Sequence, residues 1–397
     1  MSAWRCRSCH VISTNRTVVG VLCLALFGCS QQSLQTSKEQ GEAFRHCMGV
    51  LRVPNMKECI DAKTKQLVDQ KESERARTTQ RAAQQAAAKR IDRNTMALAI
   101  DPTVSGTIYA GTLEQGILKS NDGGQTWTEI NGWIPSVVYQ GEPKTPRVTL
   151  LAIDPVTPGI VYAVSTRGLH KTTDGGASWK PLFEGKGSET VTSIAIGSQA
   201  PGTLYLGSIR GVSKSTDGGH SWIDAGLTEP THALAVDPQN NNIVYAKVEG
   251  PKAGIYKTTD GGGHWKQVYR GSEPVSLAVD RIDSNLVYAG TYSGFFKSTD
   301  GGDSWQPIGS DSLKAFTGPV KALIIHPKEK NIIYAMTGHS IHKSIDGGEN
   351  WRALEHAMTG LFARDFNGFG VDPSSHSIYV GSKGGVFRIN DSDDAPH

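Results

Sequence analysis

Net charge is almost absent from this sequence. Its 397 residues include 41 Lys and Arg against 38 Asp and Glu, whereas phosphate binding requires a concentrated basic field. We therefore expect no nucleic acid partner. Long apolar runs are also scarce. The stretch VVGVLCLALFG, residues 18–28, is too short to be a membrane-spanning helix.

This apolar run is typical of an exported chain, because Arg5, Arg7 and Arg16 precede it. It ends in LFGC, which resembles the bacterial lipobox. The resemblance implies a signal peptide over 1–28 and a lipid on Cys29. It also implies a periplasmic protein anchored to the outer membrane, because Ser30 follows. An uncleaved membrane anchor is the alternative. The C-x-x-C-H haem motif at Cys6–His10 lies in the removed leader, so we predict no cofactor.

Cysteine is scarce beyond the leader. Of six cysteines, only Cys47 and Cys59 follow the predicted lipidation site, and an oxidising compartment favours a disulfide between them. Two free thiols are the alternative. Both lie in a polar segment, 29–95, where Met56–Arg93 contains neither Pro nor Gly and predicts a helix. We interpret 29–95 as a helical tether to the membrane, with a solvated helix or disordered linker as the alternative.

From Met96 onward the chain repeats a three-strand pattern. An apolar strand such as MALAIDP precedes a tyrosine strand such as TIYAG, and a third strand such as GILKS follows. The tyrosines lie 40 to 53 residues apart, at Tyr109, Tyr162, Tyr205, Tyr245, Tyr288, Tyr334 and Tyr379. A period of this size is typical of a propeller blade.

These repeats predict an all-β fold, a seven-bladed β-propeller over 96–392. A unit of three or four short strands cannot bury its apolar faces alone, but radial stacking forms one core. The last unit stops after three strands, at VFRIN. Either the segment before Met96 closes this blade or the blade remains three-stranded.

An octet with the pattern S/T-x-D-x-G-x-x-W follows the third strand in the first six units, as in STDGGDSW from Ser298. The chain resembles the Asp-box (BNR) propeller families: bacterial sialidases, xyloglucan-degrading hydrolases, the sortilin ectodomain and the photosystem II assembly factors. The resemblance implies the fold more than an activity, because these families share turns and not chemistry.

The composition of the octet favours a structural role. Its Asp can accept the amides of a tight turn, its Gly can adopt a positive φ, and its Trp can pack against the blade and cover its edge. The structural residues are Asp122, Asp174, Asp217, Asp260, Asp300 and Asp346, with Trp127, Trp179, Trp222, Trp265, Trp305 and Trp351.

The opposite face of the propeller is where we expect a site. It would carry the loops between second and third strands and two long inter-blade loops, 131–147 and 355–368. Long loops in a fold of tight turns are often functional, and aromatics with Arg are typical of binding hot spots. Solvated loops without a ligand are the alternative. The candidate residues are Trp133, Tyr139, Arg147, Arg167, Arg210, Phe362 and Arg364.

Catalytic signatures are missing. The sequence has no H-E-x-x-H, no G-x-S-x-G, no phosphate-binding Gly loop and no convincing acidic pair on the loop face. We therefore predict no catalytic or metal residues, and if there is an activity we expect a glycosidase. The predicted function is that of a lipid-anchored periplasmic scaffold that binds envelope proteins through its loop face. A glycoside hydrolase or glycan-binding propeller is the alternative.

Overall fold

The computed structural model describes residues 63–71, 73–74, 94–132, 137–139, 142–184, 191–271, 273–309, 319–337, 340–354 and 366–390. Only the backbone is described at 137–139, 142–144, 183–184 and 390. The chain divides into two compact units, Met1–Ala83 and Gln84–His397. In the first, residues 63–71 and 73–74 are helical. These residues agree with part of the predicted tether helix, whose remainder lies outside the described residues, as do Cys29, Cys47 and Cys59. None of the described helical residues forms a helix long and apolar enough to cross a membrane.

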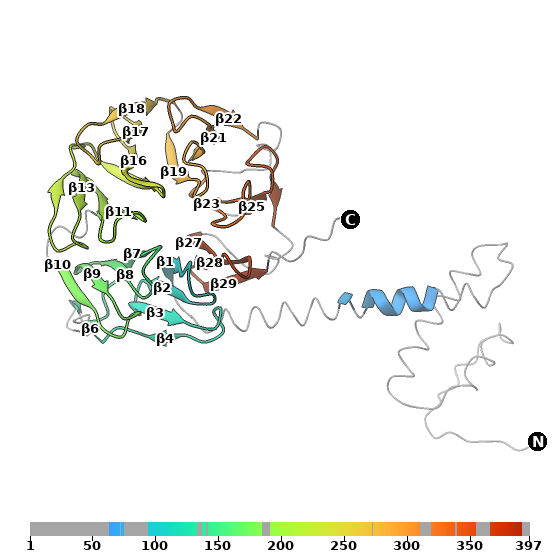
Figure 1. Ribbon diagram of the computed structural model, residues 1–397. Helices are drawn as coiled ribbons and strands as arrows, with labels where there is room; N and C mark the ends of the chain where they lie inside the picture. Colours follow the sequence, from blue (N-terminus) through green and yellow to red (C-terminus); the bar gives the residue numbers. More distant parts are fainter. Residues whose placement is uncertain are drawn as a thin grey trace, which may run out of the picture. The chain divides into compact units, whose positions relative to one another are not determined.

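The second unit contains seven blades, each an antiparallel sheet, around a central opening (Figure 1), so the prediction of a seven-bladed propeller is confirmed. The first three blades contain β1 (Thr95–Ile100), β2 (Ile108–Thr112), β3 (Ile117–Ser120), β4 (Thr128–Glu129); β7 (Val148–Ile153), β8 (Val161–Ser165), β9 (Gly168–Thr172), β10 (Lys180–Glu184); and β11 (Val191–Ile196), β12 (Leu204–Ser208), β13 (Gly211–Ser215), β14 (Ile223–Asp224). The fourth and fifth contain β15 (Thr231–Asp237), β16 (Asn240–Val248), β17 (Gly254–Thr258), β18 (Lys266–Tyr269); and β19 (Pro274–Val279), β20 (Val287–Thr291), β21 (Gly294–Ser298), β22 (Gln306–Ile308). The sixth and seventh contain β23 (Ala322–Ile325), β24 (Ile333–Met336), β25 (Ile341–Ser344), β26 (Arg352–Ala353); and β27 (Phe366–Val371), β28 (Ser377–Ser382), β29 (Gly385–Asn390).

Two features of this topology add to the predicted blades. Within the described residues the seventh sheet has three strands, in the order β27-β28-β29. The predicted long loop 131–147 contains a hairpin of its own, formed by β5 (Val137–Tyr139) and β6 (Glu142–Lys144). The second long loop lies outside the described residues except for 366–368, which begin β27.

The hydrophobic core lies in the seams between neighbouring blades. One cluster joins Tyr109 and Ile117 of the first blade to Val161 and Ala163 of the second, all 1% exposed or less. The tyrosine that marks each unit is therefore a core residue facing the next blade. This arrangement explains why a single unit cannot fold alone, since its apolar side chains are buried only by its neighbour.

The ring closes between the seventh and first blades without a shared strand among the described residues. Tyr379 of β28 packs with Ile108 of β2. The carboxylate of Asp372 accepts hydrogen bonds from the Ser105 hydroxyl at 2.8 Å and the Gly106 amide at 2.9 Å. These contacts span 267 and 266 residues of sequence, so they depend on the assembled ring.

The turns after first and third strands share one face, as predicted. In six blades an amide in the second of these turns donates to a carbonyl in the first, for example Gly123 to Gly106 at 3.0 Å and Gly301 to Asn285 at 2.9 Å. We call this the octet face. The loops between second and third strands, and the connections between blades, therefore lie on the opposite face, which we call the loop face.

Candidate functional site

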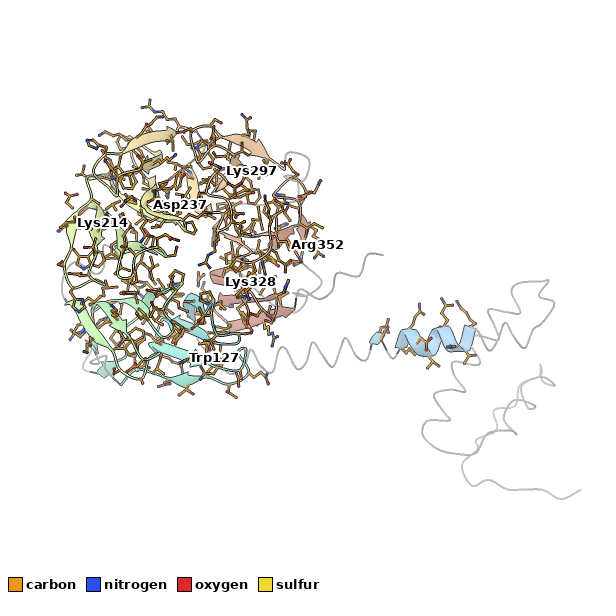
Figure 2. The ribbon with its side chains drawn as sticks, in the orientation of Figure 1. Trp127, Lys214, Asp237, Lys297, Lys328 and Arg352 are labelled. Atoms are coloured by element: carbon orange, nitrogen blue, oxygen red, sulfur yellow. The ribbon has the colours of Figure 1, made fainter. Side chains whose placement is uncertain are left out.

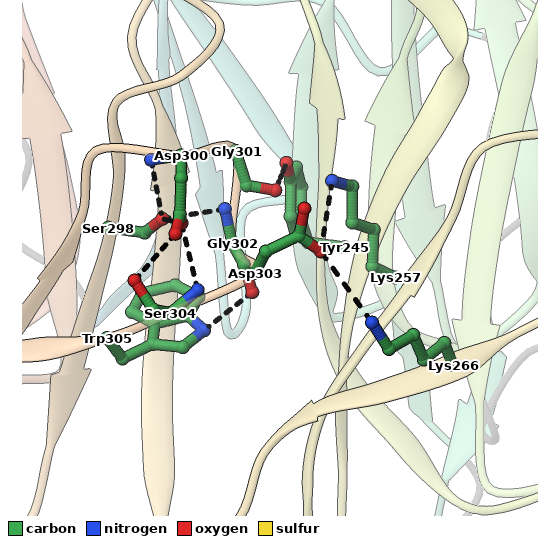
Figure 3. A network of polar contacts seen from close by, with 10 residues as sticks. All are labelled: Tyr245, Lys257, Lys266, Ser298, Asp300, Gly301, Gly302, Asp303, Ser304 and Trp305. Atoms are coloured by element: carbon green, nitrogen blue, oxygen red, sulfur yellow. Dashed lines mark hydrogen bonds and ion pairs between the residues drawn. The ribbon is translucent and has the colours of Figure 1, made fainter.

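The octet of the fifth blade forms a closed hydrogen-bonded turn (Figure 3). Asp300 accepts the Ser304 amide at 2.8 Å and the Ser304 hydroxyl at 2.6 Å. The Ser298 hydroxyl donates to Asp300 at 2.7 Å and accepts the Gly302 amide at 2.6 Å. The indole of Trp305 donates to the Gly302 carbonyl at 3.0 Å. The side chains of Ser298, Asp300, Ser304 and Trp305 are therefore engaged within their own turn.

All six octets share the hydrogen bonds of the Asp, whereas the indole of Trp265 donates to the Ala225 carbonyl of the preceding blade. The first oxygen of each Asp accepts the amide four residues later, at 2.8 or 2.9 Å. Hydrogen bonds from Ser178 to Asp174, and from Ser304 to Asp300, lower the pKa of each carboxyl to about 2. Such a carboxylate stays ionised and saturated with donors, so it is unsuited to transfer a proton.

The octet tryptophans differ in one respect from the expectation. We predicted packing against the tryptophan's own blade, but several rings pack across the seam on the preceding blade. Trp351 stacks on Phe295 with ring centroids 4.4 Å apart, and Trp305 meets Tyr269 edge-on at 5.9 Å. The physical reason is that the fourth strand is short, so the ring extends past it to the apolar side chains of the neighbouring sheet.

Each octet also receives contacts from the preceding blade. The Tyr245 hydroxyl donates to the Gly301 carbonyl at 2.6 Å, and Gly302 approaches the Tyr245 ring so closely that a Cβ there would lie 2.7 Å from it. Lys257 and Lys266 lie 3.9 and 3.8 Å from Asp303 (Figure 3). These contacts join the octet to the preceding blade, and we call them the latch between successive blades.

A cation beside the marker tyrosine completes this latch. The third strand places a Lys, or an Arg in the seventh blade, over the tyrosine of its own blade, 5.2 to 6.0 Å from the ring centroid. Sequence reasoning missed this role, although the signal was present as the Lys that precedes each octet. The seven cations are Lys119, Lys171, Lys214, Lys257, Lys297, Lys343 and Arg388.

On the loop face, Arg167 and Arg210 lie at the tips of corresponding loops in the second and third blades, and both are exposed. In each loop the Ser two residues earlier accepts the arginine amide, at 3.1 Å for Ser165 and 3.0 Å for Ser208. This turn fixes the backbone and leaves the guanidinium free to reach solvent. Neither arginine forms an ion pair with a described residue.

The structure places one further candidate residue close to Arg167. The carbonyl of Arg147, which is exposed, accepts the Thr166 amide at 3.0 Å, so Arg147 lies beside the loop that carries Arg167. Only the backbone of Tyr139 is described, in β5. Trp133, Phe362 and Arg364 lie outside the described residues, so their predicted place in the site stays a prediction.

Two exposed apolar side chains on the loop face were not among the candidate residues. Ile209 is 52% exposed next to Arg210, and Tyr292 is 60% exposed at the tip of the corresponding loop in the fifth blade. Large apolar side chains at loop tips beside arginine have the composition of a protein-binding surface. We name Arg147, Arg167, Ile209 and Arg210 the loop-face patch; Tyr292 lies two blades away on the same face.

The acidic side chains of the fourth blade on this face are neutralised. Glu229 pairs with Lys252 at 2.6 Å, and Glu249 pairs with the buried Lys247 and lies 3.2 Å from His232. Hydrogen bonds from Lys252 and Lys247 lower the pKa of Glu229 and Glu249, respectively. A glycosidase acid needs a raised pKa instead, so this pair does not form a hydrolytic site.

Among the described residues, one group has the composition of a metal site: His326, Glu329 and His376. The Nδ1 atom of His326 accepts the amides of Lys328 and Glu329 at 3.4 and 3.0 Å. A neutral imidazole that accepts at Nδ1 carries its proton on Nε2, so it cannot ligate through Nε2. His376 is already paired with Glu329 at 2.8 Å. The chemistry of this donor set does not fit a metal ion.

Comparison with known proteins gives the following similarities. No family model matches the chain. A probable oligoxyloglucan-reducing end-specific xyloglucanase from Neosartorya fischeri is 32% identical over 87 residues, which cover 21% of this chain and 10% of that protein. The GH74 xyloglucanase from Xanthomonas campestris is similar in structure, with a TM-score of 0.63, 16% identity, and coverage of 77% of this chain and 53% of that chain.

A second kind of propeller is also similar in fold. YCF48 from Cyanidioschyzon merolae has a TM-score of 0.56 and 13% identity, covering 77% of this chain and 97% of that chain. YCF48 bound to D1 peptide has a TM-score of 0.55 and 15% identity, covering 76% and 94%. The chain thus spans about half of the bacterial xyloglucanase and a tenth of the fungal protein. At these identities the structural likeness establishes a seven-bladed propeller fold shared by hydrolases and by a peptide-binding protein.

Proposed function

We propose that this chain is a lipid-anchored periplasmic propeller that binds a protein of the cell envelope through its loop-face patch and acts as an assembly scaffold. The observation that carries this proposal is the pair of corresponding, exposed arginines, Arg167 and Arg210, which form no ion pair with the described residues. A guanidinium without an internal partner can pair with a carboxylate of another molecule, and the apolar Ile209 beside Arg210 adds contact area.

The partner that suits this patch is a segment with both acidic and apolar side chains. Arginine binds carboxylates in a bidentate manner, which gives orientation as well as affinity. Complementary charge also accelerates the encounter of two proteins. The peptide complex of YCF48, a propeller of similar fold, supports binding of a protein chain as a function compatible with this architecture.

Reversing the charge of both arginines should abolish capture of the partner. The variant Arg167→Glu/Arg210→Glu replaces two attractive contacts by repulsive ones, and we expect at least a tenfold loss of binding. The measurement is a pull-down from envelope extract, with captured proteins identified by mass spectrometry. The matched control, Lys180→Glu/Lys330→Glu, makes the same charge change at exposed positions on the octet side of the propeller.

An unchanged set of captured proteins in the loop-face variant would refute the site. The rival function is glycan recognition, which the similarity to xyloglucanases suggests. It is tested by incubating the wild type with xyloglucan oligosaccharides, aryl-glycosides and sialosides. Turnover of any of these substrates by the wild type would replace the scaffold proposal by a hydrolase, and binding without turnover would replace it by a lectin.

The lipid anchor is tested separately. Cys29→Ser should shift the mature protein from the membrane fraction to the soluble periplasm and remove incorporation of a labelled fatty acid, because the acylated thiol is absent. Cys47→Ser is the control and should leave both measurements unchanged. Continued labelling of Cys29→Ser would contradict the assignment of the lipidation site.

A further inference from the structure

The inner strands line an open pocket of about 440 Å³ at the octet-face end of the central opening. Its lining consists of 20 residues, of which 18 are apolar side chains or glycine. The wall therefore offers contact area and few hydrogen bonds. Cavities of this size and character accommodate small ligands with an apolar body.

A ring of corresponding residues surrounds this cavity, one from the turn after the first strand of each blade. Five of them are proline, which lacks an amide donor and presents an apolar ring. The third blade has Ser198, whose hydroxyl donates to the Pro238 carbonyl. The fifth blade has Arg281, the one charged side chain in the lining. The prolines are Pro102, Pro155, Pro238, Pro327 and Pro373.

Arg281 is half-buried in this apolar ring without a partner of its own. No described residue forms an ion pair with its guanidinium. The carboxylates that directly precede this ring position in the fifth and fourth blades accept other hydrogen bonds. Asp280 accepts the amides of Ile282 and Asp283, and Asp237 accepts the Gln239 amide and the Ser284 hydroxyl.

Burial without a counter-charge is unfavourable for the guanidinium. Desolvation lowers the pKa of Arg281, and no neighbouring carboxylate offsets this effect. Because arginine remains protonated in proteins, the positive charge persists in the apolar ring. A ligand carboxylate would restore the missing counter-charge and would be oriented by two N–H donors at once.

We propose that this cavity binds a monocarboxylate with an apolar body, in which Arg281 pairs with the carboxylate and the inner strands enclose the apolar part. The site lies at the octet-face end of the central opening, so it is separate from the loop-face patch. The proposal therefore does not rest on the proposed scaffold function. The chemistry is common to a free medium-chain carboxylate and to the C-terminal carboxylate of a peptide with apolar side chains.

Isothermal titration of the purified full chain with octanoate tests this site. We expect binding of octanoate and at least tenfold weaker binding of octanamide, which has the same apolar body without charge. Arg281→Pro restores the residue present in five other blades and should abolish the preference for octanoate. Arg281→Lys should retain part of it. Arg270→Gln, a change at an exposed arginine after β18, is the control and should leave binding unchanged.

Several outcomes would overturn the proposal. These are equal affinity for octanoate and octanamide, unchanged octanoate binding in Arg281→Pro, or no binding of any carboxylate to the wild type. A second titration compares Ala-Val-Leu-Leu with a free or amidated C-terminus. Tighter binding of the free peptide than of octanoate assigns the site to a polypeptide end, and the reverse assigns it to a small carboxylate.

Discussion

Replacing Tyr245 by alanine should lower the free energy of unfolding by about 3–5 kcal/mol, the usual cost of truncating a large buried aromatic side chain. Tyr245 is 1% exposed and packs between the fourth and fifth blades with Ile255 and Val287. Its hydroxyl donates to the Gly301 carbonyl, and its ring lies against Gly302 (Figure 3). The truncation therefore opens a cavity in a seam and disrupts the latch to the next octet.

Two further variants separate these effects. Tyr245→Phe keeps the ring and removes only the hydrogen bond, so we expect a loss of about 1–2 kcal/mol. Tyr292→Ala is the control, because Tyr292 is 60% exposed and its loss should change stability by no more than about 0.5 kcal/mol. Guanidinium unfolding monitored by tryptophan fluorescence measures the free energy of unfolding of all three variants. A similar, small loss for Tyr245→Ala and Tyr292→Ala would show that the seam tyrosines do not hold the blades together.

The seam chemistry explains why the fold could be predicted from sequence. Tyr109, Tyr205 and Tyr245 occur in the second strand of their units because each contacts the next octet. A contact that repeats in space leaves a repeat in the sequence. The number of blades, the strand order and the assignment of the two faces all follow from that register. Figure 2 shows the radial order of these positions, since Trp127 and Lys297 lie well outside the central opening and Asp237 lies close to it.

The candidate sites could be predicted only in part, because they consist of exceptions to the repeat. Arg167 and Arg210 were found because they share a loop position. The exposure of Ile209 and Tyr292 could not be predicted, because it depends on what surrounds each side chain in three dimensions. Arg281 was missed because a single arginine in a turn does not indicate a binding site. Its significance depends on the five prolines that line the same opening at corresponding positions. Ring closure by Asp372 could not be predicted from local sequence patterns either, because its partners lie 266 and 267 residues away in the sequence.

Acidification should destabilise the propeller well before its octet carboxylates titrate. His170 in β9 and His342 in β25 are 2% and 1% exposed, and they occupy the strand position that Leu118 has in the first blade. Burial lowers the pKa of each imidazole from 6.5 to about 4. The native state therefore keeps both rings neutral, while the unfolded chain protonates them near pH 6.5.

The sign of the effect follows from proton uptake. Between pH 6.5 and 4 the unfolded state binds more protons than the native state, so the free energy of unfolding falls as the pH falls. The loss amounts to about 3 kcal/mol per histidine once the pH reaches 4, from 1.36 kcal/mol per pKa unit. The octet carboxylates of Asp174 and Asp300, with a pKa of about 2, release their stabilisation only as the pH falls from 3.8 towards 2, so the two effects are separable.

The measurement is guanidinium unfolding at intervals from pH 7.5 to pH 4. His170→Leu and His342→Leu, which install the residue of the first blade, should each flatten the profile by about half, because one of two proton-uptake sites is removed. Retention of the full pH dependence in the double variant would exclude these histidines as its cause. The expected flattening would show that two buried histidines in the third strands confine full stability of the propeller to near-neutral pH.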